Sequence, residues 1–600
     1  MTRLSQVLFG VLVAASLAAF FVAQELKSQP SLIQDFQLVW PVISPNADSR
    51  NDAQRVRFRL KEADTVDVAI VDSDGDEVRE ILSGAPLAAY RYPQPTPSWD
   101  GKNDRGDPAP DGVYRVRITL RDHGRNVIVP DSFRVDRTPP AVKIVAIGPD
   151  PGRGPEILPT KAREPARIRI NAPVRNGRAR MLFFRTDVFP ARLAAQRAMA
   201  AGSSVVSWSG TDDQGRPVSA GTYLAVAEVR DAAGNIGTST TLDARGLPRR
   251  VYGRPLPGRG GITVRRLAAQ PPLVAGRVGG PRIGLLVDSR NRPYDWSVRR
   301  VGGPTIRRGR AVRPQVALKP PGSSSGVYVF EAVRGPHRAA VPFAVDDAER
   351  HRVLVVLPLM TWQGRNLVDD DGDGLPNDLP GGHAAKLARV LARPLPATFA
   401  EREAPTLIHL DGARHRYDVT TDLALALRRG PRLEDHAGVL LAGDAVWMPP
   451  ALQRRLRRFV TRGGTLATVG IGSLQREARL TPRLRLINPT PRASADIWGS
   501  RITPPAPGDF ELVGLDDELG LFTGTDGSFG GFTSAEVTTA TGPAKVVSSG
   551  VTADGRKVIL ALRVGRGTVI RFGLPELPAR LRDDPELQAL MERTWDLLSR

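Results

Sequence analysis

The spacing of apolar residues changes character once along the chain, close to residue 350. Before that point, short runs such as Val56-Arg-Phe-Arg-Leu60 and Ala166-Arg-Ile-Arg-Ile170 carry an apolar side chain at every second position. This alternation is typical of antiparallel strands that bury one face. Beyond it, unbroken apolar runs such as Val353–Leu357 alternate with amphipathic segments, which predicts strands buried on both faces between helices. We therefore expect a multidomain chain, with all-β domains first and an α/β domain last.

One sixteen-residue segment occurs twice without a gap, as Trp99–Tyr114 and as Trp208–Tyr223. The copies share seven residues at a constant offset of 109 positions, among them the Trp, the Tyr and three glycines. In such a segment a Trp ends a strand, an Asp- and Gly-rich turn reverses the chain, and a Tyr opens the next strand. Because 109 residues is close to the length of one immunoglobulin-like sandwich, we expect two sandwiches, at 35–140 and 141–245.

This motif resembles the immunoglobulin-like domain of the flagellar hook-capping protein family, and the resemblance covers roughly residues 35–245. It implies the fold and no flagellar role, because such modules occur on many exported proteins. The preceding loop, Ser44–Asp52, resembles the acidic opening loop of similar modules, with Ala47 and Ser49 in place of two glycines. We interpret this loop as a structural turn, with a cation site as the alternative. A further β-rich stretch at 250–347 lacks the Trp turn and predicts a third sandwich.

The residues from 348 to 600 predict a mostly parallel sheet with helices on both faces. The amphipathic segment 450–463 places Leu452, Leu456, Phe459 and Val460 on one face, as in a helix packed on a sheet. The other elements expected here are strands at Val353–Leu357, Gly438–Gly443, Thr465–Val469, Lys557–Leu562 and Gly567–Phe572, and a last helix at Pro585–Leu598.

Three segments of this half, 357–363, 439–448 and 463–472, resemble the large-subunit family of N,N-dimethylformamidase. The resemblance covers roughly residues 340–600 and implies a flavodoxin-like domain of the class I glutamine-amidotransferase type. In that fold the nucleophile lies on a sharp turn after the strand equivalent to Thr465–Val469. Ile471 stands at that position and has no nucleophilic atom, and Ser473 could serve only if the turn were shifted.

Other catalytic groups give no clear pattern. The chain has no cysteine, which excludes disulfides, thiolate metal sites and a cysteine nucleophile. No triad spacing singles out a histidine in this half, where His383, His409, His415 and His436 occur. We therefore expect a domain without catalytic residues, and leave open whether the protein is an enzyme.

The segment Asp369–Asp378 is the best chemical motif in the chain. Its carboxylates at Asp369, Asp371 and Asp373 alternate before a glycine, as in the first half of an EF-hand loop. Calcium prefers several oxygen ligands, so the carbonyl of Leu375 and the side chains of Asn377 and Asp378 would complete the set. The usual glutamate at the twelfth position is replaced by Pro380. The segment predicts a Ca²⁺ site, and a solvated acidic loop is the alternative.

The N-terminus and the charge bear on location. Val7–Ala23 is an uncharged apolar run, which predicts a signal anchor within residues 1–27, or else a cleaved signal peptide. No other run is comparable, so we expect one membrane pass with the bulk outside the cytoplasm, or a secreted protein. The net charge of +21 is carried by scattered arginines rather than by one basic element. The scattered distribution argues against sequence-specific nucleic-acid binding. The positive charge itself allows attraction to an anionic cell-wall or surface polymer.

Three functions remain open from the sequence. The first is a cell-surface protein whose immunoglobulin-like modules present a non-catalytic amidotransferase-like domain to a ligand or partner. The second is an exocytoplasmic amide or glycan hydrolase with an unrecognised site. The third is a structural or adhesive spacer. The missing nucleophile argues against the second, and the elaborate C-terminal domain argues against the third.

Overall fold

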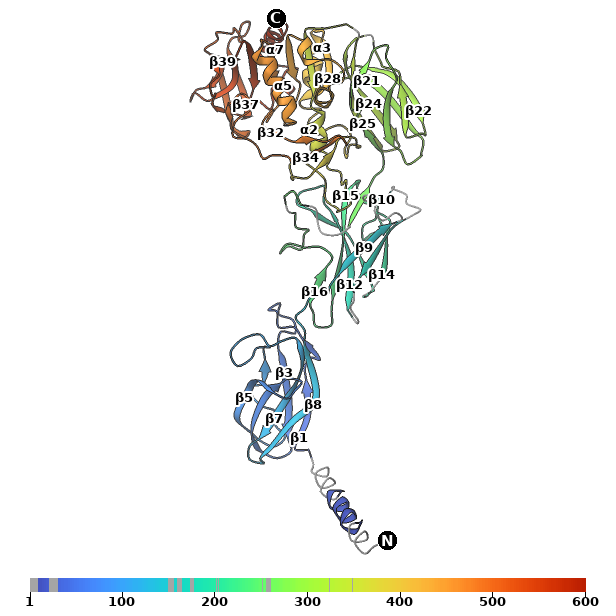
Figure 1. The fold of residues 1–600 in the computed structure, drawn as a ribbon, viewed down its shortest axis with the longest axis vertical. Helices are drawn as coiled ribbons and strands as arrows, with labels where there is room; N and C mark the ends of the chain where they lie inside the picture. The colour runs from blue at the N-terminus through green and yellow to red at the C-terminus, as the bar shows by residue number, and fades with distance from the viewer. Residues whose placement is uncertain are drawn as a thin grey trace.

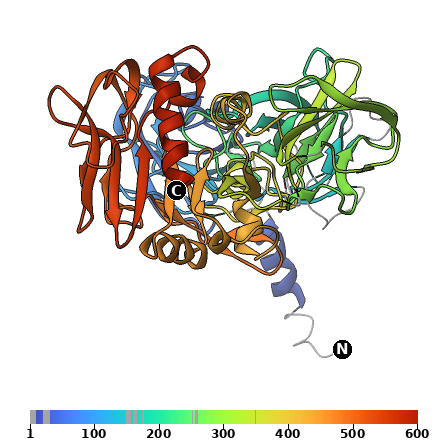
Figure 2. The same cartoon turned by 90° about the horizontal axis from the view of Figure 1, so that it is seen from above.

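The computed structural model describes residues 9–20, 31–148, 156–158, 165–172, 177–200, 202, 204–250, 252–254, 260–322, 324–347 and 349–600. Figure 1 shows an extended arrangement, with a helix at the N-terminal end, two β modules in line, and a broad region that contains the C-terminus. We call this region, residues 267–600, the head. Figure 2 shows the head from above, with the green third β module on one side and the red C-terminal strands on the other.

The first module has two sheets around one core, in the strand orders β1-β3-β6 and β2-β8-β7-β4-β5. Trp99 is only 1% exposed and packs on Tyr114 and Phe133, with ring centroids 5.1 and 5.8 Å away. The buried Trp confirms the core position that the repeat predicts. The strands are β1 Ile33–Leu38, β2 Val42–Ile43, β3 Gln54–Leu60, β4 Asp64–Val71, β5 Glu77–Leu87, β6 Ser98–Trp99, β7 Gly112–Leu120 and β8 Arg125–Val135.

The second module repeats this core. Trp208 is 1% exposed, stacks on Phe183 at 4.2 Å and meets Tyr223 at 5.3 Å. Its sheets are β14-β11-β9 and β10-β17-β15-β12-β13, with β16 paired to β15. The last strand of this module, β17, lies beyond residue 245, where the sequence places the end of the sandwich. The strands are β9 Lys143–Gly148, β10 Glu156–Leu158, β11 Ala166–Asn171, β12 Arg178–Arg185, β13 Arg192–Met199, β14 Ser204–Trp208, β15 Gly221–Arg230, β16 Ile236–Thr238 and β17 Gly261–Val264.

The joint between these two modules is made by the loop Ser44–Asp52. Asn235 of the second module donates to the carbonyl oxygen of Asp136 at 2.8 Å and accepts from the hydroxyl of Ser44. Ala47 and Ser49 have φ values of 64° and 66°, so the chain keeps the left-handed path that glycines would adopt more easily. The carboxylate of Asp52 holds this path, because it accepts backbone N–H bonds from both residues at 3.0 and 2.7 Å.

The third β-rich stretch has sheets in the orders β18-β20-β23 and β19-β25-β24-β21-β22, around a separate core. Val327, Val329, Ala340 and Ala344 face away from that core and belong to the core of the α/β half. Residue 347, where the sequence places a domain boundary, is thus spanned by one continuous core. The strands are β18 Ala268–Gln270, β19 Gly276–Arg277, β20 Ile283–Asp288, β21 Tyr294–Arg300, β22 Thr305–Ala311, β23 Gln315–Leu318, β24 Gly326–Arg334 and β25 His337–Asp346.

The α/β half is built on a mixed sheet in the order β28-β26-β29-β31-β41-β40-β39-β36-β37. The first five strands are parallel and the rest are antiparallel. Its main strands are β26 Val353–Leu357, β28 Asp418–Thr421, β29 Gly438–Leu441, β31 Thr465–Thr468, β36 Ala506–Leu515, β37 Ser528–Ala535, β39 Lys545–Thr552, β40 Lys557–Val564 and β41 Gly567–Phe572. The short strands are β27 Ala385–Lys386, β30 Trp447–Met448, β32 Arg476–Glu477, β33 Arg479–Leu480, β34 Arg485–Ile487, β35 Arg501–Ile502 and β38 Thr538–Ala540.

The helices confirm the amphipathic pattern, and the sheet differs from the expectation. They are α2 Leu359–Gly364, α3 Glu403–Gly412, α4 Asp422–Ala426, α5 Pro450–Thr461, α6 Leu577–Arg580 and α7 Pro585–Leu598, with a 3₁₀ turn at Leu433–Asp435. In α5 the predicted apolar face is buried. The prediction of a mostly parallel sheet is wrong for its C-terminal part. Only Gly565 and Arg566 join β40 to β41, and two residues can close a hairpin but cannot make a parallel crossover.

Only part of the predicted anchor is described. Residues 9–20 are helical, and Val7, Leu8 and residues 21–23 of the apolar run lie outside the described residues. Among the described residues, no helix is both long enough and apolar enough to span a membrane.

Candidate functional site

The turn after β31, at the carboxyl ends of the parallel strands, is where the sequence places a nucleophile. Ile471 is buried there, as is Ser473. The Ser473 hydroxyl donates to the carbonyl oxygen of Gly470 at 3.0 Å and accepts from the backbone N–H of Ala445 at 3.2 Å. Its hydrogen atom and an oxygen lone pair are therefore engaged in holding two loops together. Gly470 is required by close approach, because a Cβ there would lie 1.9 Å from the carbonyl oxygen of Gly443.

The backbone amides of the same turn are taken by carboxylates. The N–H of Ile471 donates to Asp444 at 2.8 Å, and the N–H of Gly472 donates to both oxygens of Glu536 at 3.0 and 3.1 Å. Arg365 pairs with Asp444 at 2.8 Å. Glu536, whose side chain is fully buried, is paired with two arginines, Arg492 at 2.9 Å and Arg571 at 2.6 Å. Donors that could stabilise an oxyanion are thus bound to anions of the protein itself.

A pocket of about 310 Å³ opens beside this turn, and we call it the elbow pocket. The ring of Trp447 lies between two guanidinium groups, those of Arg365 at 5.9 Å and Arg476 at 5.4 Å. Among the described residues, Arg476 has no carboxylate partner, and neither side-chain polar atom of the buried Gln475 has a hydrogen-bond partner. The elbow pocket therefore offers unused polar groups and positive charge to a small ligand. Its lining residues are Arg365, Pro380, Val446, Trp447, Ile471, Gly472, Gln475, Arg476, Arg492 and Glu536.

Glu403, at the start of α3, is a titratable group that the sequence does not single out. Its Oε1 accepts from the indole N–H of Trp362 and from the hydroxyl of Thr398, each at 3.1 Å. Its Oε2 has no hydrogen-bond partner among the described residues, and burial raises the pKa of the Glu403 carboxyl to about 7. It lies against Gly443, where a Cβ would come within 2.3 Å of Glu403 Oε1. Glu403 comes close to Gly443 only when the chain folds, so no local sequence motif predicts its position.

The four histidines that the sequence analysis names in this half lie elsewhere, and none of them lines the elbow pocket. His409 and His415 share the carboxylate of Glu592, at 3.0 and 2.9 Å. His383 is buried, with Nε2 unpartnered among the described residues. His436 pairs with Asp418 at 2.9 Å, in a cluster described below.

The acidic loop brings together three of the six predicted ligands. Carboxylate oxygens of Asp369, Asp371 and Asp373 lie within 4.8 Å of one another, so they form a possible metal-binding group. Burial, and then the charge of Asp373, raise the pKa of the Asp369 carboxyl to about 8. Asn377 donates from its side-chain amide to Asp371 at 3.1 Å. Its amide oxygen accepts the backbone N–H of Asp370.

The other two predicted ligands also contact the second module. Asp378 is paired with Arg250 of the second module at 2.7 Å, which occupies its Oδ1. The side chain of Leu375 enters an apolar cluster with Leu182, Phe184, Leu224 and Val226 of the second module. The acidic loop therefore also ties the head to the second module, a role that ligand spacing alone does not predict.

Backbone contacts strengthen this attachment. The hydroxyl of Thr186 donates to the carbonyl oxygen of Gly374 at 2.6 Å. The backbone N–H of Gly261 donates to the carbonyl oxygen of Gly372 at 2.9 Å. Within the head, the buried guanidinium of Arg389 donates to four carbonyl oxygens and to the Asp370 carboxylate. One arginine thus fixes both ends of the loop.

Two domain families match parts of the chain. Residues 45–124 match the FlgD Ig-like domain, and residues 313–496 match the family described as N,N-dimethylformamidase beta subunit-like, C-terminal. The second match begins inside the third module and crosses residue 347, as the shared core does. No curated protein matches the chain.

Several solved structures are similar over parts of the chain. β-Galactosidase from Bacillus circulans sp. alkalophilus is 16% identical with a TM-score of 0.24, over 32% of this chain and 26% of that one. Exo-β-1,4-mannosidase Op5Man5 from Opitutaceae bacterium strain TAV5 is 14% identical with a TM-score of 0.26, over 42% and 36%. The C-terminal fragment of intimin is 14% identical with a TM-score of 0.22, over 36% and 65%. The chain spans less than two thirds of each of these proteins.

The fold and the family matches agree on the two resemblances that the sequence carries. Part of the first module, residues 45–124, is similar to the FlgD Ig-like domain, and residues 313–496 are similar to the N,N-dimethylformamidase beta subunit-like, C-terminal family.

Proposed function

We propose that this chain is an exocytoplasmic surface protein in which β modules present a non-catalytic, amidotransferase-like domain that binds a small anionic ligand. The observation that carries the proposal is the occupied turn after β31. An acyl-transfer site needs free N–H donors for the developing oxyanion, and those of Ile471 and Gly472 are bound to Asp444 and Glu536. Freeing them would leave buried carboxylates without these donors, which is costly.

The sheet order supports the amidotransferase-like assignment. Numbered along the chain, the five parallel strands lie in the order 2-1-3-4-5, which is the flavodoxin-like order. In such sheets ligands bind beyond the carboxyl ends of the strands, near the point where the order reverses, here between β26 and β29. Arg365 follows the helix after β26 and Trp447 follows β29, and both line the elbow pocket. For the chain as a whole we propose an anchor at 1–27, a first sandwich at 35–140 and a second that begins at 141 and continues through β17. A third β module and this α/β domain then meet near residue 347 in one core.

The chemistry of the elbow pocket favours an anion with a flat or compact acidic group. Arg476 supplies a charge without a protein counter-ion, Trp447 a flat surface, and Gln475 an amide free to donate or accept. Inorganic phosphate and succinate are suitable probes, and binding is followed by calorimetry. We expect Arg476→Gln to weaken binding at least about tenfold, as the loss of a charge-assisted hydrogen bond does. Arg479→Gln, which removes an exposed arginine nearby, is the matched control. Equal binding by both variants would reject the pocket as the site.

The proposal includes calcium at Asp369, Asp371 and Asp373, and an N-terminal membrane anchor. Two buried carboxylates and one exposed carboxylate close together favour a hard divalent cation. A cell-wall or surface polymer is the proposed macromolecular partner. Membrane fractionation and protease treatment of intact cells test the location. Recovery of the protein in the cytosol would contradict it.

An amide hydrolase is the second candidate, and Glu403 is the observation that favours it. A buried carboxyl with a pKa of about 7 is suited to general acid or base chemistry. The assay is release of dimethylamine from N,N-dimethylformamide by the full-length protein. Our proposal expects none. Turnover that disappears in Glu403→Gln would replace our proposal with this alternative.

A further inference from the structure

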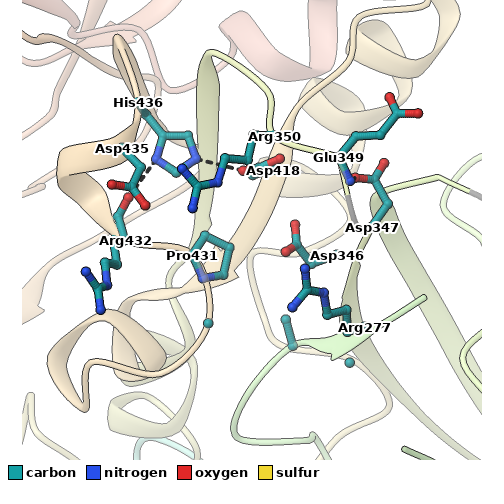
Figure 3. Close-up of a pocket in the computed structure, with 13 residues that line it drawn as sticks. Arg277, Asp346, Asp347, Glu349, Arg350, Asp418, Pro431, Arg432, Asp435 and His436 are labelled. Carbon is teal, nitrogen blue, oxygen red and sulfur yellow. Dashed lines mark hydrogen bonds and ion pairs between the residues drawn. The ribbon is translucent and has the colours of Figure 1, made fainter. Parts of the chain in front are cut away.

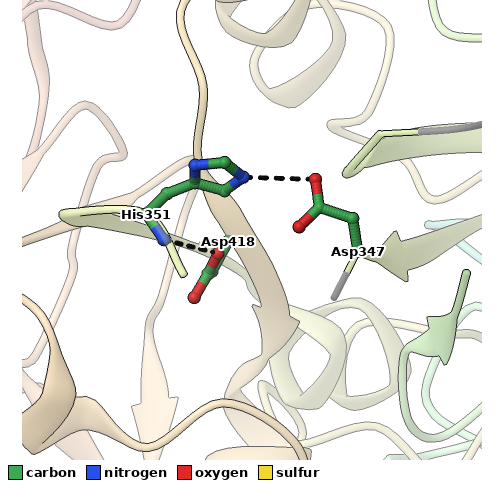
Figure 4. Close-up of side chains that lie close together, drawn as sticks. All are labelled: Asp347, His351 and Asp418. Atoms are coloured by element: carbon green, nitrogen blue, oxygen red, sulfur yellow. Dashed lines mark hydrogen bonds and ion pairs between the residues drawn. The ribbon is translucent and has the colours of Figure 1, made fainter. Parts of the chain in front are cut away.

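A second group of metal-ligand side chains lies at the opposite end of the parallel strands from the elbow pocket. Asp347 follows β25, His351 precedes β26, and Asp418 opens β28. One ligand atom from each of the three lies within 4.8 Å of the other two. Their side chains are 8%, 9% and 7% exposed, so each is more than nine-tenths buried. Figure 4 shows the His351 ring pointing to Asp347, while its backbone N–H is bonded to Asp418.

Two cavities meet at this cluster. One, of about 600 Å³, is lined from both the third module and the α/β half, and the other, of about 560 Å³, lies beside His351. Asp347 and Glu349 line both cavities. Figure 3 shows the first cavity, with His436 on one side and Asp346 on the other. The cluster is therefore reached from solvent without opening the fold.

The two carboxylates of this cluster are paired with histidines, although the chain is rich in arginine. Several buried carboxylates elsewhere in the head are paired with guanidinium groups, such as Asp370 with Arg389 and Glu536 with Arg571. Within the described residues, no arginine or lysine forms an ion pair with Asp347 or Asp418. Each of these two meets an imidazole instead, at 3.1 and 2.9 Å. An imidazole is itself a common ligand of transition metals, so these carboxylates lie next to side chains of the type that completes such a site.

The distance between two of the three ligand atoms fits a small transition-metal ion. His351 Nε2 and the Asp347 carboxylate oxygen are 3.1 Å apart. Two ligands of a tetrahedral zinc ion are about 3.3 Å apart, given Zn–N and Zn–O bonds of roughly 2.0–2.2 Å. An ion between these two atoms would replace this hydrogen bond and take both of them as ligands.

The surroundings of the three side chains are those of an organised site. Nε2 of His436 is hydrogen-bonded to the second oxygen of Asp418 at 2.9 Å, and its Nδ1 lies 2.7 Å from the carbonyl oxygen of Arg432. The backbone N–H of Ser325 donates to Asp347 at 3.0 Å. Such partners orient metal ligands, and their loss commonly weakens metal binding.

We propose that Asp347, His351 and Asp418 bind a borderline divalent cation of the zinc class. One imidazole and two carboxylates suit zinc or a neighbouring transition metal better than calcium, which prefers oxygen alone. Three protein ligands leave a coordination position for water or for a small ligand that enters from either cavity. The ion joins the end of the third module to β28, the edge strand of the mixed sheet, and so fixes the junction inside the head.

Calorimetric titration of the full-length protein with zinc chloride, after treatment with a chelator, tests the proposal. We expect His351→Gln and Asp347→Asn to weaken zinc binding at least about tenfold, and His436→Gln to weaken it about tenfold. His409→Gln, which removes another half-buried histidine of the head, should leave the affinity unchanged. So should Asp371→Ala combined with Asp373→Ala, which separates this site from the acidic loop.

A measurement on the unmutated protein covers the case in which a variant fails to fold. Anomalous diffraction at the zinc absorption edge locates the ion directly. A peak among Asp347, His351 and Asp418 supports the proposal. A peak elsewhere, no peak at saturating zinc, or undiminished affinity in a folded His351→Gln protein overturns it.

Discussion

The first and second β modules have the same core and the same turn, and differ in the outer face of one strand. In both, the Trp indole N–H donates to a carbonyl oxygen three residues on, at 2.7 Å for Trp99 and 2.8 Å for Trp208. In both, the Tyr hydroxyl donates to a carbonyl oxygen four residues back. These contacts maintain the fold, and they are the part of the repeat that the sequence preserves.

The two modules differ at the positions of β7 and β15 whose side chains face away from the module core. On β7 they are Arg115 and Arg117, which are partly exposed, and at the same offset β15 has Leu224 and Val226, which are 2% and 0% exposed. The difference is confined to this strand, since the residues paired with Leu224 and Arg115 on the next strand, Phe184 and Val71, are both apolar and buried. The apolar face of the second module receives Leu375 of the acidic loop. The comparison teaches that a repeated domain becomes an interface through its outward residues, while the residues that identify the repeat stay the same.

Replacement of the two Trp residues is expected to have the largest effect. Trp→Ala at either position leaves a large core cavity and should cost about 3–5 kcal/mol. Trp99→Ala should lower only one calorimetric transition, that of the first module. Trp208→Ala should also affect the head, because the acidic loop packs on the second module. An unchanged melting curve for Trp99→Ala would show that the Trp is not a core residue.

Leu224→Arg makes the second module resemble the first. It removes a buried apolar contact with Leu375 and puts a charge in its place, so we expect a loss of roughly 3–4 kcal/mol. The transitions of the second module and the head should then separate in calorimetry. The matched control is Arg115→Leu in the first module, where a surface change should stay within about 0.5 kcal/mol. If the second module and the head of the Leu224→Arg protein still unfold in one transition, the apolar cluster does not couple their unfolding.

The pH dependence should distinguish the head from the first module. Burial raises the pKa of Glu403 from 4.5 to about 7, so the folded head binds this proton more tightly than the unfolded chain does. Its contribution to the free energy of unfolding is therefore full below about pH 4.5 and is lost as the pH rises to about 7. Glu403→Gln should stabilise the head at pH 8 by about 2–3 kcal/mol and change little at pH 4.5. A gain of equal size at both pH values would exclude titration of Glu403 as the cause.

Calcium is expected to have the smallest effect. With a dissociation constant near 0.1 mM, about 1–2 mM calcium should stabilise the folded protein by roughly 1.5–2 kcal/mol. The gain should appear in the transitions of the head and the second module, and not in that of the first. Asp371→Ala combined with Asp373→Ala should abolish it, and magnesium should substitute poorly. Identical melting curves with calcium and with chelator would leave only an acidic loop.

Local patterns were sufficient for much of the fold. The repeat identifies Trp99, Trp208, Tyr114 and Tyr223 as core residues, and the 3.6-residue spacing identifies the buried face of α5. These features follow from residues close in sequence, where periodicity and turn chemistry decide the structure.

The candidate sites depend on contacts that periodicity does not record. Asp378 fits a calcium ligand by spacing, yet it meets Arg250, which lies more than a hundred residues earlier in the chain. The pair of Asp418 with His436, and the burial of Glu403, likewise arise only when separate elements come together. The turn after β31 is intermediate: the sequence shows that Ile471 cannot be a nucleophile, and only the structure shows which groups occupy its amides.

The joint at Asn235 limits the range of positions that the head can take relative to the first module. Side-chain hydrogen bonds link Asn235 to Ser44 and to the Asp136 carbonyl, and a Cβ on Gly237 would lie 1.9 Å from the Pro140 carbonyl oxygen. A connection this tight makes the two modules a stiff spacer rather than a flexible tether. A flexible tether spreads its cargo over a volume that grows with its length, whereas a stiff one concentrates it at a fixed height. The head would then meet targets at one distance from its attachment point at high effective concentration, and would miss those nearer or farther.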